Sequence, residues 1–285
     1  MANLKEIRNR IASVSSTMQI TSAMKMVSAA KLKKAQDAIT AMRPYSDKLT
    51  ELLQGLSASL DGDAGSKFAD NREVKKVLVV AITSNRGLCG AFNTNILKQC
   101  STLLNMYADK QVDFMAIGKK ANDILSKKNT IVSNHSDIYD NLTFDNAAGI
   151  AENLMRLFTE GEYDKIELVY NKFKNAATQL VMTEQFLPIQ PMEDDKAAAS
   201  DYIFEPSKPE IVEQLIPKSL KTQLFKAIRD SFASEHGARM TAMHKATDNA
   251  TELRDQLKLT YNKARQAAIT NEILEIVGGA EALNN

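Results

Sequence analysis

A glycine-containing segment near the middle of the chain has the composition of a ligand-binding turn. It reads SNRGLCGAFN at positions 84–93 and follows an apolar run at 77–83 that is typical of a buried strand. Backbone amides at such a strand-to-helix turn can bind phosphate. The segment lacks the Gly-Lys-Ser/Thr of a P-loop, and it has only two of the three glycines of a dinucleotide fingerprint, at the wrong spacing. A structural turn is the simpler interpretation, and a ligand site is the alternative.

The histidines and paired carboxylates do not form a convincing catalytic or metal pattern. His135 stands alone, while His236 and His244 are about two turns apart if they share a helix. Glu272 and Glu275 share a helix face, where paired carboxylates are usually solvated. The sequence has no Gly-x-Ser-x-Gly elbow and no cysteine and histidine placed as a dyad. We therefore predict no catalytic residue, no metal and no cofactor, so the chain is not an enzyme by itself.

The composition is that of an ordinary globular protein of one or two domains. Of 285 residues, 44% are hydrophobic and 25% are charged. No apolar run approaches the roughly 20 residues needed to span a bilayer, and the first residues lack the apolar stretch of a signal peptide. We expect a soluble intracellular protein, or at most a peripheral one. Cys89 and Cys100 are too few for a disulfide framework, so we expect reduced, structural thiols.

Charge is distributed unevenly along the chain. Residues 1–43 contain 8 basic and 2 acidic side chains, residues 44–217 contain 18 and 25, and residues 218–285 contain 10 and 8. The basic first segment could be a solvated face, bind an acidic protein surface or bind nucleic acid. Salt-sensitive DNA binding would favour the third alternative, and we expect only weak, non-specific binding.

Apolar residues near the N-terminus alternate steps of three and four, which is the spacing of a heptad seam. The series is Leu4, Ile7, Ile11, Val14, Met18 and Thr21, and the stripe then passes to Met24, Val27, Leu32, Ala35, Ile39 and Met42. This pattern predicts one shift of register after Thr21. Pro44 is expected to kink or end the helix, although apolar residues at helical spacing after it suggest that the helix resumes.

The C-terminal segment has a longer seam of the same kind. Its positions are Met243, Ala246, Ala250, Leu253, Leu257, Thr260, Ala264, Ala267, Asn271 and Leu274. No proline occurs between Pro217 and Gly278, so one helix of about 60 residues, or about 90 Å, is predicted. A domain of about 130 residues has a radius of gyration near 14 Å, so this helix must project and needs a partner. We expect it to pair antiparallel with the N-terminal helix.

The middle of the chain alternates short β-rich runs with helical stretches. We expect strands at 77–83, 112–117, 165–170, 180–187 and 202–204, and helices at 94–107, 119–127 and 146–159. This alternation predicts a Rossmann-like α/β domain with a largely parallel sheet. The predicted fold is therefore an antiparallel coiled coil, made of residues 1–57 and 209–285, with a central α/β domain at 74–206. Residues 61–66 and 193–197 have the composition of mobile connections.

Both ends of the chain resemble the gamma subunit of rotary F-type ATP synthase. The N-terminal match is IRNRIASV at 7–14, QITSAMKMV at 19–27 and AKL at 30–32, and the C-terminal match is ITNEILEIVGGAEA at 269–282. RGLCG at 86–90 and LVYNKFK at 168–174 support it, so the resemblance covers essentially the whole chain. It implies a central-stalk rotor that couples proton-driven rotation of a membrane ring to conformational cycling of catalytic subunits during ATP synthesis, and the reverse during hydrolysis. A shaft without symmetry biases each catalytic subunit toward a different conformation.

The resemblance also implies partners and contact residues. The partners are the alpha and beta subunits of the catalytic ring, the epsilon subunit and the membrane c-ring, at the cytoplasmic face of a bacterial inner membrane, with no nucleic acid and no small-molecule substrate. The residues implied to contact catalytic subunits are Met24, Lys25, Val27, Arg239, Gln266, Thr270 and Glu272, and those implied to turn in an apolar bearing are Ile276, Val277 and Ala280. A nucleotide-binding enzyme is the rival interpretation, which micromolar ATP binding by the isolated chain would favour. We expect none.

Two positions depart from the family pattern. Gly237 lies where the family usually has alanine, and glycine inside a helix costs about 1 kcal/mol, so we expect the shaft to be locally softer there. Asn85 replaces an aspartate that commonly precedes the RGLCG segment.

Overall fold

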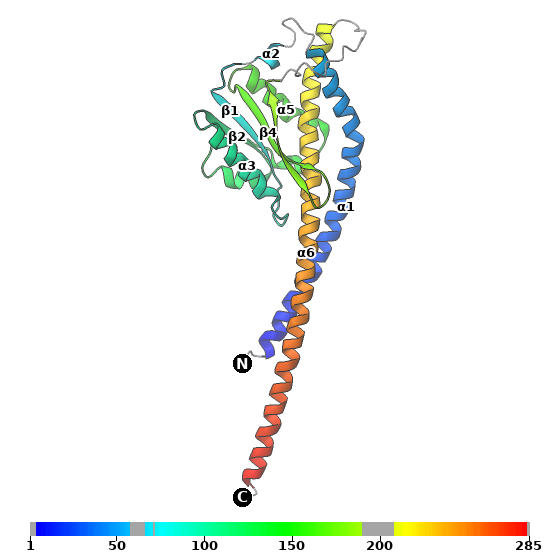
Figure 1. Cartoon of the computed structure of the whole chain (residues 1–285), viewed down its shortest axis with the longest axis vertical. Helices are drawn as coiled ribbons and strands as arrows, with labels where there is room; N and C mark the ends of the chain where they lie inside the picture. Colours follow the sequence, from blue (N-terminus) through cyan, green and yellow to red (C-terminus); the bar gives the residue numbers. More distant parts are fainter. Residues whose placement is uncertain (1–3, 58–65, 71, 190–207, 284–285) are drawn as a thin grey trace. The chain divides into compact units, whose positions relative to one another are not determined.

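The computed structural model describes residues 4–57, 66–70, 72–189 and 208–283. They contain two long helices, α1 (Leu4–Ser57) and α6 (Lys208–Leu283), and a five-stranded sheet (Figure 1). The chain divides into two compact units. We call residues 1–28 with 240–285 the helical unit and residues 29–239 the α/β unit, and each long helix has residues in both. None of the described helices holds a stretch long and apolar enough to cross a membrane.

The sheet of the α/β unit has the strand order β3-β2-β1-β4-β5. The strands are β1 (Lys76–Ile82), β2 (Gln111–Ile117), β3 (Ile131–Asn134), β4 (Lys165–Phe173) and β5 (Gln179–Leu187). All neighbours pair parallel except β4 and β5, which are antiparallel. Residues 77–82 of β1 are all fully buried, because a central parallel strand is covered on both faces and needs a continuous apolar run. The predicted Rossmann-like sheet is thus confirmed.

Helices cover both faces of this sheet. Helices α3 (Phe92–Met106) and α4 (Lys119–Leu125) pack on one face. Helix α5 (Phe144–Thr159) and the α/β-unit part of α6 pack on the other. The short helices α2 (Ser66–Ala69) and η2 (Ser136–Tyr139) lie in connections. The helix α5 begins where the Thr143 hydroxyl accepts a hydrogen bond from the Asn146 amide, which is an N-cap.

Several predicted boundaries differ from the structure. The strand β3 was not predicted, and the predicted strand at 202–204 and connection at 193–197 lie outside the described residues. The expectation that Pro44 could end the first helix is wrong, since α1 continues through it to Ser57. Burial of Ser46 and Leu49 beyond the proline supplies packing that offsets the lost backbone hydrogen bond. Pro217 likewise lies inside α6.

In the helical unit, α1 and α6 pair antiparallel, as predicted. The Arg8 guanidinium donates to the Tyr261 hydroxyl at 2.8 Å. Further along α1, and earlier along α6, Thr247 donates to Thr21 at 2.8 Å between the two hydroxyl oxygens. Threonine side chains at a helix interface allow the two backbones to approach closely, so this pair is slender.

The predicted shift of register in α1 is wrong. Every position of a single heptad series from Ile7 to Met42 is buried or half-buried; the series is Ile7, Ile11, Val14, Met18, Thr21, Lys25, Ser28, Leu32, Ala35, Ile39 and Met42. Val27, which was expected in the seam, is 57% exposed. The shift was inferred because the two middle positions, Lys25 and Ser28, are polar and were passed over in favour of apolar neighbours.

The predicted seam of α6 is only partly correct. Met243, Ala246, Ala250, Leu257 and Ala264 are buried or half-buried. Leu253 and Thr260 are exposed, and the neighbouring positions 254 and 261 take their places in the seam. All residues from 265 to 280 are exposed, so the seam ends at Ala264. The described part of α1 provides no packing partner beyond this point, because Arg8, near its start, already contacts Tyr261.

Gly237 permits a close approach of the chain in the α/β unit. A Cβ atom at this position would lie 3.2 Å from the Cα of Ala176, in the connection between β4 and β5. Close packing against Ala176 therefore explains why glycine suits this position, in addition to any effect on helix stiffness.

Candidate functional site

The glycine-containing turn joins the carboxyl end of β1 to α3. Its first residue, Ser84, donates two hydrogen bonds within the turn: its amide donates to Asn93 Oδ1 at 3.0 Å, and its hydroxyl donates to the Arg86 carbonyl at 2.7 Å. Leu88 and Gly90 both have positive φ, 62° and 59°. Positive φ is uncommon for a leucine, so the surrounding contacts must hold the turn in this form.

The polar groups beside this turn are hydrogen-bonded within the chain. The Thr83 carbonyl accepts a hydrogen bond from the Tyr139 hydroxyl at 2.9 Å, and the Thr83 hydroxyl accepts one from the Ala121 amide at 2.8 Å. Asn85 donates to the Ser136 carbonyl at 2.7 Å and accepts from the Lys119 amide at 2.9 Å. Ligands of open α/β sheets bind at the carboxyl ends of the strands, so these internal bonds occupy groups that a nucleotide would use. The geometry favours the structural interpretation of the turn.

Both cysteines are free and buried. Burial raises the pKa of the Cys89 thiol, and burial raises that of Cys100 to about 12. Neither thiol has the depressed pKa of a reactive cysteine, which agrees with the prediction of structural thiols.

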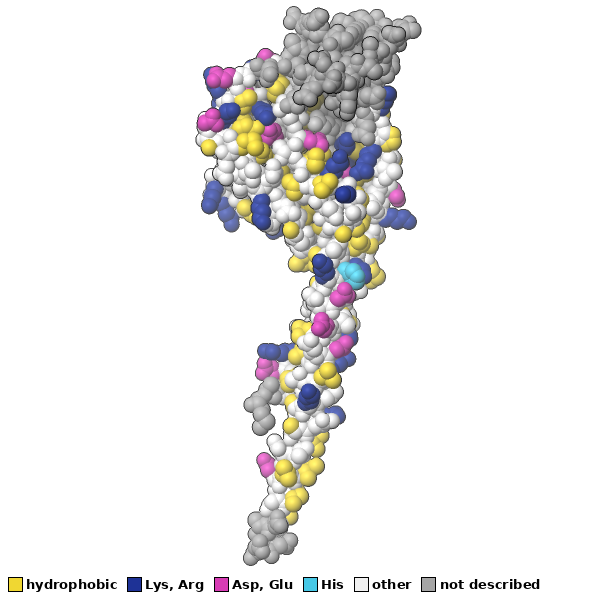
Figure 2. All heavy atoms as spheres, viewed as in Figure 1, with side chains coloured by type: hydrophobic (Ala, Val, Ile, Leu, Met, Phe, Trp, Pro, Cys, Tyr) yellow, Lys and Arg dark blue, Asp and Glu magenta, His cyan; other side chains and the backbone are white. Residues whose placement is uncertain are grey.

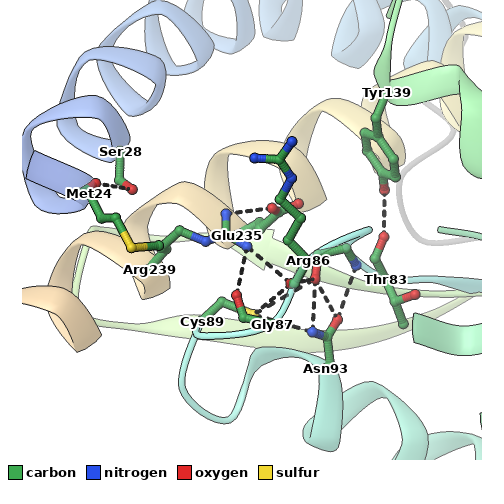
Figure 3. Close-up of polar contacts among 11 residues, drawn as sticks. Met24, Ser28, Thr83, Arg86, Gly87, Cys89, Asn93, Tyr139, Glu235 and Arg239 are labelled. Atoms are coloured by element: carbon green, nitrogen blue, oxygen red, sulfur yellow. Dashed lines mark hydrogen bonds and ion pairs between the residues drawn. The ribbon is translucent and has the colours of Figure 1, made fainter. Parts of the chain in front are cut away.

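The structure places Arg239 in the interior of the α/β unit. Its side chain forms an ion pair with Glu235, with 2.6 Å between Nη1 and Oε1, and donates to the carbonyls of Arg86 and Gly87 at 3.1 and 3.2 Å (Figure 3). Arg239 is only 7% exposed. A partner would reach its guanidinium only after these contacts break.

The remaining residues implied to contact catalytic subunits lie in the helical unit. Met24 and Lys25 are half-buried and Val27 is exposed. Lys25 Nζ lies 3.4 Å from His244 Nδ1, and that nitrogen lies 3.3 Å from the Asp248 carboxylate. The residues near the C-terminus are all exposed; they are Gln266, Thr270, Glu272, Ile276, Val277 and Ala280.

The three histidines have separate environments. His135 hydrogen-bonds Ser133, with 3.0 Å between its Nε2 and the hydroxyl, and burial lowers its pKa. His244 is exposed in the helical unit. His236 is 5% exposed, packs edge-on against Phe232, and neither ring nitrogen has a hydrogen-bond partner. Burial, and then the charges of Arg239 and Lys31, lower the pKa of His236 to about 4.

Replacing His236 by phenylalanine is expected to reduce acid sensitivity. Because the folded pKa lies below the ordinary value of 6.5, the unfolded chain binds more protons between about pH 6.5 and 4, and stability falls as pH falls through this window. Between about pH 6.5 and pH 4, the free energy of unfolding of the wild type should fall by about 3 kcal/mol more than that of His236→Phe. Urea denaturation at several pH values would measure this difference. An unchanged slope in His236→Phe would contradict the argument.

Sequence reasoning missed the buried charged groups of the α/β unit. Glu235 pairs with Arg239, and Asp230 pairs with Arg43, with 3.4 Å between Nη2 and Oδ1. Burial raises the pKa of both carboxyls, and the paired arginines only partly offset it. The available signal was the spacing of Glu235 and Arg239, four residues apart within a helix segment that is otherwise apolar and small.

Comparisons with known proteins find similarity to ATP synthase gamma chains along essentially the whole chain. A family model described as ATP synthase matches residues 3–283. The ATP synthase gamma chain of Flavobacterium johnsoniae is 75% identical over 285 residues, which cover 100% of both chains. In the Tetrahymena thermophila mitochondrial ATP synthase central stalk and c-ring structure, one chain is similar with a TM-score of 0.61 at 28% identity, covering 80% of this chain and 99% of that one. A chain of the Euglena gracilis mitochondrial ATP synthase rotor has the same fold, with a TM-score of 0.67 at 23% identity, covering 93% and 98%.

Proposed function

The chain belongs to the ATP synthase gamma chain family, the non-catalytic central-stalk rotor of that complex, and we propose that it transmits torque between a proton-driven membrane ring and the catalytic subunits. Rotation would present a different face of the helical unit to each catalytic subunit in turn, and each face would favour a different conformation. In synthesis the membrane ring drives this rotation, and in hydrolysis the catalytic subunits drive it backward.

The end of α6 is the observation that carries this proposal. From 265 to 280 the helix is exposed on every side, and it carries large apolar residues of the kind that are normally buried. These are Ile269, Ile273, Leu274, Ile276 and Val277, each at least 48% exposed, and Figure 2 shows hydrophobic side chains along this part of the helix. An exposed apolar surface of this kind marks an interaction site. A ring of surrounding subunits would cover all sides of such a helix at once.

Contacts to the catalytic subunits are proposed at two levels of the helical unit. Met24 and Val27 would face the moving part of a catalytic subunit, together with the exposed ammonium end of Lys25, whose side chain is half-buried in the seam. The charge of Lys25 suits an acidic surface there. Nearer the C-terminus of α6, the exposed side chains of Gln266, Thr270 and Glu272 would make the second set of contacts. The bearing would be formed by Ile276, Val277 and Ala280, which offer an apolar surface without charge.

Away from the turn at 84–93, the α/β unit is proposed to contact the epsilon subunit and the membrane c-ring. The chain would then lie at the cytoplasmic face of a bacterial inner membrane as a peripheral protein. The predicted division at 1–57, 74–206 and 209–285 would separate the part that enters the catalytic ring from the part that stands on the membrane ring.

Reconstitution tests the proposed function. The chain should copurify with alpha and beta subunits and restore cooperative ATP turnover to them. A chain that stays monomeric with these subunits and leaves their ATPase activity unchanged would refute the proposal.

Replacing Lys25 by glutamate should weaken coupling while assembly survives. A like charge placed against an acidic surface costs several kcal/mol at the contact, so we expect protons pumped per ATP hydrolysed to fall by roughly half. Proton pumping by the reconstituted membrane complex is the measurement. Lys34→Glu makes the same charge change at an exposed position of α1 and is the control. Wild-type pumping in Lys25→Glu would show that the contact does not exist.

A further inference from the structure

The side chain of Arg239 uses its planar shape to join two parts of the α/β unit. One terminal nitrogen contacts the Glu235 carboxylate, one turn earlier on α6, and the other donates to the carbonyls of Arg86 and Gly87 (Figure 3). A guanidinium can make these contacts together because its donors point in fixed directions from two separate terminal nitrogens, whereas an ammonium offers its donors from one atom. The arginine therefore ties the turn after β1 to α6.

The turn that Arg239 holds has an unfavourable backbone. Leu88 has a φ of 62°, which costs a residue with a Cβ roughly 1–2 kcal/mol, and its side chain is 65% exposed. The next residue, Cys89, is by contrast buried. The Arg86 carbonyl accepts hydrogen bonds from both Arg239 and Ser84, so two side chains hold the turn just before Leu88. These contacts keep Leu88 outward and Cys89 inward.

Burial of the ion pair is not explained by stability alone. Both side chains of the Arg239 and Glu235 pair are about nine-tenths buried. Removing two charges from water offsets much of their attraction, so a buried pair adds little net stability. The geometry of the pair, however, keeps the backbone carbonyls of Arg86 and Gly87 within hydrogen-bond distance of the Arg239 guanidinium. Specifying the form of the turn accounts for the pair better than stabilising the fold does.

We propose that Arg239 and Glu235 are positioning residues that clamp the turn at 86–88, so that Leu88 and Arg86 face a catalytic subunit. Arg239 then affects coupling through the turn, without touching the partner. Arg86 and Leu88 are both exposed, and together they suit an apolar surface flanked by carboxylates. The identity of the partner rests on the proposed function, whereas the clamp itself does not.

Cys89 reports on the clamp in the isolated full-length chain. If Arg239 holds the turn, Arg239→Ala should open it and raise the rate of maleimide labelling at Cys89 about tenfold, which corresponds to a loss of about 1.4 kcal/mol. Glu235→Gln and Arg239→Lys should each give a smaller rise. Cys100, fully buried on the inner face of α3, is the internal reference and should label at the wild-type rate. Peptide mass spectrometry distinguishes the two thiols.

A matched control comes from the C-terminal end of α5 and its C-cap residue. Arg156 and Glu160 have the same four-residue spacing and the same 2.6 Å separation, but both are about half exposed. Arg156→Ala should leave labelling of Cys89 unchanged. A selective rise at Cys89 in the clamp variants supports the proposal. If labelling of Cys89 does not rise in Arg239→Ala, the proposal is overturned. It is also overturned if both Arg239→Ala and Glu235→Gln raise labelling of Cys89 and Cys100 equally.

A double-mutant cycle in the reconstituted complex tests whether Arg239 acts through the turn. Leu88→Ala and Arg239→Ala should each reduce coupled proton pumping, and the double variant should be no worse than the more severe single variant. Additive losses would show that Arg239 acts independently of Leu88, and would overturn the indirect role. If the subunits do not assemble at all, the proposed function fails, while the labelling result still decides the clamp.

Discussion

Replacing Gly118 by alanine is expected to prevent the α/β unit from folding. Gly118 follows β2 with a φ of 108°, and a Cβ atom there would lie 2.1 Å from the Thr83 carbonyl oxygen. The obstacle is backbone immediately after β1, the middle strand of the sheet, so no side chain can move aside to relieve it. A loss of more than about 4 kcal/mol is expected, which is a large part of the stability of a typical domain.

Gly149→Ala is the control for this prediction. Gly149 lies inside α5, and nothing lies within 4 Å of the position of its missing Cβ. Alanine should stabilise the helix by about 0.5–1 kcal/mol, because it is the better helix former. Soluble yield and urea denaturation followed by circular dichroism would compare the two variants. A Gly118→Ala chain with the wild-type midpoint would disprove the steric argument.

Replacing Lys165 by methionine is expected to destabilise the α/β unit by about 3 kcal/mol, because it leaves a buried carboxylate without its cation. Lys165 Nζ lies 2.8 Å from Glu167 Oε1 and donates to the Tyr107 hydroxyl at 2.8 Å. Tyr107 in turn donates to the same carboxylate at 2.7 Å. The other oxygen of Glu167 has no hydrogen-bond partner. Lys165→Met with Glu167→Gln removes both charges and should recover at least half of the loss.

The same pair predicts a pH dependence in the alkaline range. Burial alone would lower the pKa of Lys165, but hydrogen bonds to Glu167 and Tyr107 raise it above its ordinary value of 10.5. A raised folded pKa contributes stability that is present below pH 10.5 and is lost as pH rises through the folded value. The stability difference between wild type and Lys165→Met should therefore be largest at pH 7 and should shrink as pH rises through the folded pKa of Lys165.

Lys75→Met is the control for the lysine variant, because Lys75 pairs with Glu73 on the surface. It should change the free energy of unfolding by less than about 0.5 kcal/mol. Urea denaturation of wild type, the two single variants and the double variant at pH 7 is the measurement. Equal midpoints for Lys165→Met and wild type would contradict the prediction.

The sequence predicts the central strands well and the edge of the sheet poorly. Strands β1 and β2 were found because their apolar runs reflect burial on both faces. Strand β3 has four residues, none of them fully buried, so its sequence carries little of that signal. The long helices were predictable from periodicity over many turns, whereas Pro44 was misjudged because distant packing decides whether a helix survives a proline.

Periodicity fixes which residues face a partner only when apolar residues mark every seam position. Lys25 and Ser28 lie in the α1 seam, and reading past them produced a false shift of register. The exposure of 265–280 could not be predicted from the pattern either, since the heptads of α6 continue beyond the described part of the partner helix. A pattern shows that a face is suited to packing; it does not show whether a partner is present.

The candidate site was predicted in its parts and missed in its connections. The turn at 84–93 and Arg239 were both singled out, but about 150 residues separate them in sequence, and no local pattern reveals that the guanidinium reaches the Arg86 carbonyl. The same holds for Tyr107 and Lys165, which the sheet brings together. Charged groups buried between distant elements are the features that sequence reasoning is least able to place.

The uncovered end of α6 has a consequence for the thermodynamics of assembly. A single helix of this length without a packed partner is only marginally stable in water. Part of the binding free energy must then be used to order it, which lowers the affinity gained per unit of buried area. Burying Ile269, Ile273, Leu274, Ile276 and Val277 should also give a large negative heat-capacity change. Calorimetry of assembly with a chain truncated after Ala264 would show how much of that change belongs to this segment.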